Sequence, residues 1–248
     1  MVIAEYEAMY QVYMVLIVYF TPWDYIEDRS DAMEDDVQQK IDQFFSQYPQ
    51  RSYPEDQIII FAEENPDKVF HIVSGKVAQY DISYRGDEVI INLFKSPAFF
   101  PMANAINHID NHFFFKTETE TVVQVAPPKD VVQFLRDNPD VMLDLLSRVY
   151  KGLDGVLGRM VHLMSGTARS RLIYELIIEC RRFGHPEKGT GYILDTHETH
   201  LAARSGLSRE TVSREMKRLK EQSIIAINPS GIHVVDLPRL ESLLGLEI

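Results

Sequence analysis

The chain has 248 residues, of which 45% are hydrophobic, and its formal net charge at pH 7 is −12. That length suits one large domain or two small ones. The single cysteine, Cys180, excludes an internal disulfide, a cysteine-ligated iron–sulfur cluster and a cysteine-rich zinc site. A chain with one cysteine also suits a reducing compartment, so we expect a cytoplasmic protein.

The N-terminal region contains an apolar run, residues 9–20, with the sequence MYQVYMVLIVYF. Its 12 residues fall short of the roughly 18–20 needed to cross a bilayer, and no basic residue precedes it as in a signal peptide. We therefore expect a buried strand or helix here and no membrane partner. Residues 1–34 are treated as an N-terminal extension, because MEDDVQQKIDQFF could also open the protein at Met33 as an amphipathic helix.

Residues 58–125 have the texture of short strands. The runs are QIIIF, KVFHIVSGKVAQYDI, EVIINLF, AFF, HFFFKT and TVVQVA. Turn signals separate them at Asn65-Pro66-Asp67, Ser74-Gly75, Arg85-Gly86-Asp87 and Ser96-Pro97. Many short strands at this spacing predict an antiparallel barrel or jelly roll, which we place at residues 35–138.

A long helix is predicted at residues 139–164, after a short helix at residues 129–136. Its apolar positions recur in steps of four and three, at Met142, Leu146, Val149, Leu153, Val156, Met160 and Leu163. A period of 3.5 residues is typical of a coiled-coil seam, and the simplest partner is the same helix of a second subunit. The alternative is that this face packs on its own barrel.

The last part of the chain, residues 165–248, predicts a helix-turn-helix followed by a β-hairpin. We expect Ser165 to cap a helix that begins near Ala168, followed by a strand, GYILDT. Two helices then flank the turn SGLS, with Leu201, Ala202, Leu207, Val212 and Leu219 facing inward, and SIIAI and GIHVVDL form a β-hairpin.

Charge is distributed unevenly between the C-terminal third of the chain and the part that precedes it. Residues 165–248 hold 12 Lys/Arg against 11 Asp/Glu, whereas residues 1–164 hold 13 against 26. Residues 199–220 alone contain six basic side chains and two acidic ones, Glu210 and Glu215. A local charge of +4 in an acidic protein indicates a nucleic-acid contact. The alternative is a solvated helix with ion pairs between successive turns.

Four polar side chains lie in the first turns of the second helix and should point outward, where a recognition helix meets base edges: Arg209, Glu210, Ser213 and Arg214. An arginine fork can bond guanine O6 and N7, and a carboxylate can accept a hydrogen bond from cytosine N4. Glu210 is the most informative of the four, because phosphates would repel it unless it reads a base or orients an arginine. The phosphate contacts are assigned to Thr199, His200, Thr211, Arg218 and Lys220.

The segment THETHLAARSGLSRETVSREMKRLKEQSIIAI resembles the DNA-binding motif of the Crp/Fnr superfamily of bacterial transcription regulators. FHIVSGKVAQYDISYRGDEVIINLF is similar to that family's β-roll sensor, so the resemblance covers roughly residues 33–248. It implies an α+β fold with an N-terminal β-roll (a double-stranded β-helix or jelly roll), a long dimerisation helix and a C-terminal winged helix-turn-helix. It also implies a homodimer bound to double-stranded DNA at an inverted-repeat operator, with RNA polymerase as a further partner.

By position, Arg209, Glu210, Ser213 and Arg214 match the family's base-reading residues. Arg209 resembles the catabolite-activator branch and Ser213 the fumarate-nitrate branch, whereas Glu210 and Arg214 are common to both. The resemblance therefore implies a G·C pair in the core of each half-site.

The sensor segment departs from the family's cyclic-nucleotide motif. Phe99-Phe100 is followed by Pro101-Met102, where the family has Gly-Glu, and the phosphate-binding arginine falls near Asn111-His112. A cyclic phosphate would thus lack its cation partner, so we do not expect cyclic AMP or GMP to bind. The effector is unassigned, and no other cofactor is identified.

Other classes of protein find less support. His71, His108 and His112 are scattered, and we expect no haem or metal site from them. His197 and His200 suit a position near phosphate better than a metal site. No nucleophile–base set or phosphate-cradling glycine loop indicates an enzyme. The alternative function is an effector-binding or protein-interaction module that keeps the fold without regulating DNA.

Overall fold

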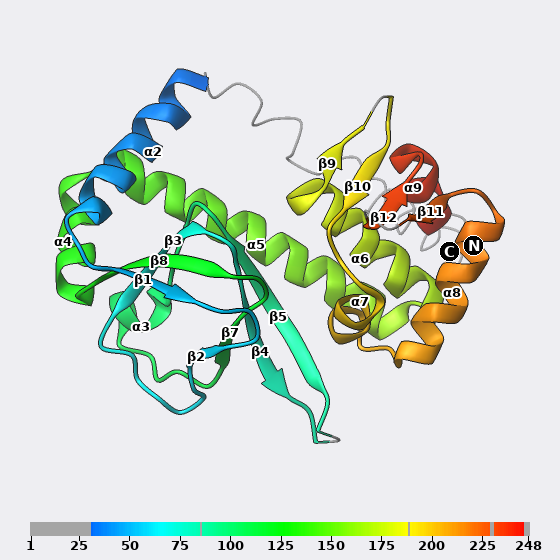
Figure 1. Cartoon of the computed structure of the whole chain (residues 1–248), viewed down its shortest axis with the longest axis horizontal. Coiled ribbons are helices and arrows are strands. Elements are labelled where there is room, and N and C mark those ends of the chain that lie inside the picture. The colour runs from blue at the N-terminus through cyan, green and yellow to red at the C-terminus, as the bar shows by residue number, and fades with distance from the viewer. Residues whose placement is uncertain (1–30, 85, 188, 229–230, 246–248) are drawn as a thin grey trace, which may run out of the picture. The chain divides into compact units, whose positions relative to one another are not determined.

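The computed structural model describes residues 31–84, 86–187, 189–228 and 231–245 (Figure 1). The chain separates into two compact units, Met1–Phe44 and Phe45–Ile248. The first unit contains most of helix α2 (Asp31–Ser46), on which Val37 and Ile41, one helical turn apart, are buried. The apolar run at residues 9–20 lies outside the described residues.

The N-terminal half of the second unit is a β-sandwich, as predicted. Its two four-stranded antiparallel sheets have the orders β1-β8-β3-β6 and β2-β7-β4-β5. The strands are β1 (Gln50–Tyr53), β2 (Ile58–Ile60), β3 (Val69–Ser74), β4 (Lys76–Ile82), β5 (Glu88–Lys95), β6 (Ala98–Phe100), β7 (Phe114–Thr117) and β8 (Thr121–Ala126). The predicted turn at Ser74-Gly75 requires glycine, because Gly75 has a φ of 96° and a Cβ there would collide with Thr121.

The core between these sheets follows from strand register. Phe70 of β3 pairs with Phe100 of β6 on one side and with Val125 of β8 on the other, which places three apolar side chains in one row. Phe100 lies in the middle of an aromatic stack, with ring centroids 5.7 Å from Phe70, 5.0 Å from Phe94 and 5.2 Å from Phe115. The interior of this sandwich, called the barrel below, is therefore filled by aromatic packing.

Three helices follow or interrupt the strands: α3 (Met102–Asn107), α4 (Pro128–Asp137) and α5 (Pro139–Ser165), the long green helix of Figure 1. Both α4 and α5 begin with a proline. Proline is tolerated in the first helical turn, because the amides of that turn have no hydrogen-bond partner within the helix and proline has no amide hydrogen to leave unpaired. The predicted helices at residues 129–136 and 139–164 therefore correspond to α4 and α5 within one residue at each end.

The C-terminal part contains a second mixed layer of helices and strands. Its elements are α6 (Ala168–Phe183), β9 (His185–Pro186), β10 (Tyr192–Leu194), α7 (Glu198–Ser205), α8 (Arg209–Glu221), β11 (Ile225–Asn228), β12 (Gly231–Val234) and α9 (Leu237–Gly245). The strands form a sheet in the order β11-β12-β10-β9. This is the predicted winged helix-turn-helix, to which β9 and α9 are additions that the sequence patterns did not indicate.

One expectation about this region is wrong. Ser165 is the last residue of α5 and does not cap α6; the N-cap is Thr167, whose side chain accepts a hydrogen bond from the backbone amide of Ser170. Ser165 instead donates its hydroxyl to the carbonyl of Val161, one turn back within α5. Two hydroxyl residues flank Gly166, and the pattern alone did not distinguish them.

Candidate functional site

The turn between α7 and α8 is built by local sequence chemistry. Gly206 adopts the left-handed conformation, with φ of 63°, and its amide donates to the carbonyl of Ala202. Ser208 then caps α8, because its side-chain oxygen accepts a hydrogen bond from the amide of Thr211 at 3.3 Å. Both ends of the turn are thereby held by hydrogen bonds within the chain.

Helix α8 divides into a buried and an exposed face. Val212, Met216 and Leu219 are buried in the core that α6, α7 and the small sheet share, as are Leu201 and Ile232. On the opposite face lie the side chains predicted to read bases, all exposed: Arg209, Glu210, Ser213 and Arg214. The structure therefore brings these four residues together in the first two turns of one helix.

Glu210 is ionised on this face. Its own backbone amide, and then the hydroxyl of Ser208, donate hydrogen bonds that hold the pKa of the Glu210 carboxyl below its usual value. Both donors belong to the N-terminus of α8, where a negative charge is favoured by the unpaired amides of the first turn. Glu210 therefore presents an acceptor to any base that approaches this end of the helix.

The residues predicted to contact phosphate are less uniform. Thr199, Arg218 and Lys220 are exposed, and Thr211 is half-buried. His200 is directed elsewhere: its Nε2 lies 3.3 Å from Oε2 of Glu118, which follows β7 in the sensor barrel. This pairing of residues far apart in sequence was not visible in any local pattern.

His200 belongs to a larger junction between the barrel and the helix-turn-helix. Phe183 of α6 is buried in one cluster with Ala78, Tyr80, Ile90 and Leu93 of β4 and β5. Polar contacts surround this cluster. Lys76 Nζ lies 3.0 Å from Asp195 Oδ2, and Arg182 donates to the carbonyl of Leu93 at 3.2 Å. The hydrogen bond and the charge of Lys76 lower the pKa of the Asp195 carboxyl.

A hollow of about 180 Å³ lies at this junction. Its lining is mostly charged and polar: Glu55, Lys76, Leu93, Glu118, Thr119, Glu179, Asp195, His197, His200 and Arg204. Small-molecule pockets are commonly about 300–1,000 Å³ and mainly apolar. Both its size and its lining therefore distinguish this hollow from a typical effector site.

Helix α5 carries an apolar stripe that the rest of the described chain leaves uncovered. Six of the seven predicted seam residues are exposed, with fractions from 39% at Leu163 to 57% at Val149, and Val156 is half-buried. Only Val141, near the start of α5, is buried. The stripe is therefore not covered by the barrel of its own chain, which was the alternative that the sequence left open.

The sensor turn is described by the polar contacts of Asn111 and His112. The segment from Met102 to Phe115 contains neither arginine nor lysine. Asn111 is buried and its side-chain amide donates to the carbonyls of Phe61 and Phe113, so it is used within the turn. His112 is exposed, and its Nδ1 lies 2.9 Å from Oε1 of Glu63.

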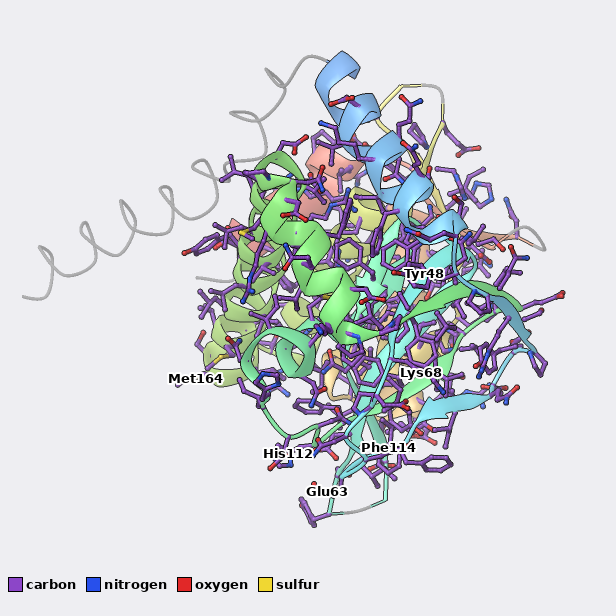
Figure 2. The ribbon with its side chains drawn as sticks, turned by 90° about the vertical axis from the view of Figure 1, so that its left-hand side faces the viewer. Tyr48, Glu63, Lys68, His112, Phe114 and Met164 are labelled. Atoms are coloured by element: carbon purple, nitrogen blue, oxygen red, sulfur yellow. The ribbon has the colours of Figure 1, made fainter. Side chains whose placement is uncertain are left out.

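Figure 2 shows His112 and Glu63 at the same end of the barrel, near Phe114. The hydrogen bond with Glu63, followed by the charge of that carboxylate, raises the pKa of His112. Even when protonated, His112 would already be neutralised by a carboxylate, whereas an anionic ligand needs an uncommitted cation. His112 of this turn is therefore already paired with a carboxylate of the same chain.

Within the described ranges, no group of three His, Cys, Asp or Glu side chains is arranged to hold a metal ion. His71 is buried, stacks on Phe45 with ring centroids 4.5 Å apart, and lies 3.2 Å from Gln124 through Nδ1. In the same ranges no helix has the length and apolarity that a bilayer crossing requires.

Sequence reasoning missed three buried carboxylates in the C-terminal part. Glu175 and Glu179 of α6 are each 1% exposed and pair with Arg159 and Arg204. Glu215, on α8, is 4% exposed. The signal for Glu215 was present in the sequence, because it occupies a position three residues after Val212 within the helix's apolar stripe.

Comparison with known proteins agrees with this architecture. The family model described as a cyclic nucleotide-binding domain matches residues 50–138, and the Crp-like helix-turn-helix domain matches residues 170–243. The global nitrogen regulator of a Nostoc species is 26% identical over 191 residues, 74% of this chain and 83% of that protein. The cyclic AMP receptor protein of Thermus thermophilus is 23% identical over 205 residues, 83% of this chain and 92% of that protein.

Solved structures show the same fold. The structure of a CooA mutant from Carboxydothermus hydrogenoformans matches with a TM-score of 0.69 at 18% sequence identity, over 82% of this chain and 90% of that one. With the two matched domains in the order sensor then helix-turn-helix, the chain is a Crp/Fnr-type DNA-binding transcription regulator with an effector-sensing domain.

Proposed function

We propose that the chain binds an inverted-repeat operator as a homodimer, with Arg209, Glu210, Ser213 and Arg214 of α8 reading base edges. The observation that carries this proposal is the two-faced helix α8, whose buried stripe fixes these four side chains on the exposed side. Arginine and glutamate on one face match the edges of a G·C pair. The proposed phosphate contacts are Lys220, Arg218, Thr199 and Thr211.

The dimer is proposed to form through α5. The exposed stripe supports it, because six large apolar side chains at a 3.5-residue period would otherwise remain in water. A second copy of the same helix supplies a matching surface across a two-fold axis. Two α8 helices related by that axis would then read half-sites about one helical turn apart. On this plan residues 139–164 form the dimerisation helix, flanked by the sensor at residues 35–138 and the DNA-binding domain at residues 165–248.

The effector is proposed to be something other than cyclic AMP or cyclic GMP. Support comes from the sensor turn, where Met102 and His112 stand in place of the acidic and cationic groups that a cyclic nucleotide uses, and where Asn111 is committed to backbone carbonyls. The aromatic packing around Phe100 and Phe115 favours an apolar ligand over an anionic one. As a regulator of transcription, the bound dimer would meet RNA polymerase in the cytoplasm.

The DNA proposal is tested by selection from randomised duplexes with the purified full chain. We expect enrichment of an inverted repeat with a G·C pair in each half-site. Arg214→Ala should weaken binding to the selected duplex by about 1–3 kcal/mol and relax the preference at one base pair per half-site. Lys220→Ala should weaken selected and scrambled duplexes alike and lower the slope of log affinity against log salt by about one.

If both variants lost equal affinity for selected and scrambled duplexes, α8 would be only a general basic surface, and the alternative of a protein-interaction module would be favoured.

The dimer is tested separately. The double variant Val149→Asp, Val156→Asp should be monomeric by light scattering and should not bind the selected duplex.

The effector proposal is tested by titration calorimetry with cyclic AMP and cyclic GMP. Neither should show saturable heat, and submillimolar binding of either would overturn the effector proposal.

A further inference from the structure

Glu215 occupies a position in α8 that the fold reserves for apolar side chains. Val212, Met216 and Leu219, the other residues of that stripe, are each at most 1% exposed, and Glu215 itself is 4% exposed. Water contributes little to the solvation of this carboxylate. A buried carboxylate costs several kcal/mol unless cations and hydrogen bonds compensate it. The partners of Glu215 therefore indicate what the residue does.

Both partners come from the DNA-facing side of the same helix. Oε1 of Glu215 lies 2.7 Å from Nη1 of Arg218 and 3.8 Å from Nε of Arg214. The Arg218 and Arg214 side chains are 55% and 60% exposed, so each remains largely in water while one of its nitrogens meets the buried carboxylate. The second oxygen, Oε2, is buried and has no hydrogen-bond partner among the residues that the structure describes.

The contact with Arg214 is made at Nε. The two terminal nitrogens of that guanidinium are therefore left for the guanine edge that Arg214 is proposed to read. Arg218 is held differently, because its contact uses a terminal nitrogen, which a phosphate oxygen would also seek. Any phosphate contact by Arg218 must compete with Glu215, whereas a base contact by Arg214 need not.

We propose that Glu215 is a positioning residue for sequence-specific DNA recognition: its buried carboxylate orients Arg214 toward bases and restrains Arg218 from phosphate. Its effect is to weaken sequence-independent binding more than operator binding, and so to raise discrimination between them. This role rests on the proposed function of α8, because it requires Arg214 to read bases.

The test uses the full chain with Glu215→Gln and Glu215→Leu. Glutamine keeps the shape without the charge, and leucine completes the apolar stripe, so at least one variant should fold as the wild type does by circular dichroism. Affinity is measured for the duplex selected by the wild type and for a scrambled duplex, at several salt concentrations. The matched control is Glu221→Gln, which removes the same charge from an exposed position on the same helix.

We expect both Glu215 variants to bind scrambled DNA more tightly and to lose about tenfold in the ratio of selected to scrambled affinity, the equivalent of one released charge-assisted contact. The slope of log affinity against log salt should steepen by about one, as for one added phosphate contact. Glu221→Gln should shift both duplexes slightly and equally.

A purely structural role gives a different result. In that case the Glu215 variants would change the melting temperature, and the affinity ratio and the salt slope would stay at the wild-type values, which overturns the proposal. Equal weakening on both duplexes would also overturn it. If the wild type itself shows no preference for any selected duplex, the proposed function of α8 fails first, and that outcome is read from the wild type alone.

Discussion

The barrel interior and the C-terminal interior are stabilised by different kinds of contact. Around Phe100, the barrel core is a stack of aromatic rings that brings no charge with it. The C-terminal part instead places charged groups inside or against its core, with Arg204 (6% exposed) paired with Glu179 and Glu215 paired with Arg218. The stability of an apolar core does not depend on charge and therefore changes little with salt. The stability of a buried ion pair depends on both partners, because removal of one leaves the other charge buried and uncompensated.

The largest effect is expected from breaking one buried pair. Glu179→Leu leaves the Arg204 guanidinium buried without its carboxylate and should lower the free energy of unfolding by about 3–5 kcal/mol. The double variant with Arg204→Leu should recover most of that loss, because neither charge remains to be compensated. Urea unfolding followed by circular dichroism measures both. If the double variant were as unstable as the single one, the loss in the free energy of unfolding would come from the missing ion pair and not from an uncompensated Arg204 charge.

A smaller effect is expected in the barrel. Phe100→Leu removes a ring that stacks on three others but keeps an apolar side chain, so the free energy of unfolding should fall by about 1–2 kcal/mol. Because no charge is involved, the loss should be the same at low and high salt. A clear salt dependence would contradict the division between the two interiors.

The junction pair should contribute less again and should depend on pH. Asp195 is 65% exposed, so its pair with Lys76 is worth under about 1 kcal/mol. Because the pKa of Asp195 is lower in the folded chain, its contribution is present above the ordinary aspartate value and is lost as pH falls through the lowered one. Asp195→Asn should therefore be less stable than the wild type at pH 7, and the difference should vanish in strong acid. A difference that grows in acid would contradict this sign.

The smallest effect concerns Cys180, which sits among apolar side chains of the C-terminal core. Burial is the main cause that raises its pKa to about 12, so the thiol is neutral near pH 7 and is a poor nucleophile. Maleimide labelling should be slow in the folded chain and fast in denaturant. Rapid labelling of the folded chain would show that this core opens far more readily than its packing indicates.

Local patterns predicted what local chemistry determines. The left-handed Gly206, the Ser208 cap and the stripe of Val212, Met216 and Leu219 all act within a few residues, so the helix-turn-helix followed from the sequence. The period of α5 likewise predicted its exposed seam. The Ser165 cap was wrong because Thr167, two residues later, offers the same hydroxyl chemistry at the true helix start.

Contacts between distant residues were beyond such patterns. His200 meets Glu118, 82 residues earlier, and Arg204 of α7 meets Glu179 of α6 across the two strands β9 and β10. Neither pairing has a periodic or spacing signal, because tertiary packing alone brings the partners together. For that reason His200 was assigned to phosphate from its position beside the turn, while the structure directs its ring toward the barrel.

Strand β5 receives two arginines from different helices. Arg159 of α5 donates to the carbonyl of Ile91, and Arg182 of α6 donates to the carbonyl of Leu93. Residues two apart in a strand share an orientation, and one residue of travel is about 3.3 Å, more than either hydrogen bond can stretch. A shift of β5 by a single residue along its axis would therefore break both hydrogen bonds. This strand thus couples helix α5 to helix α6 of the DNA-binding part.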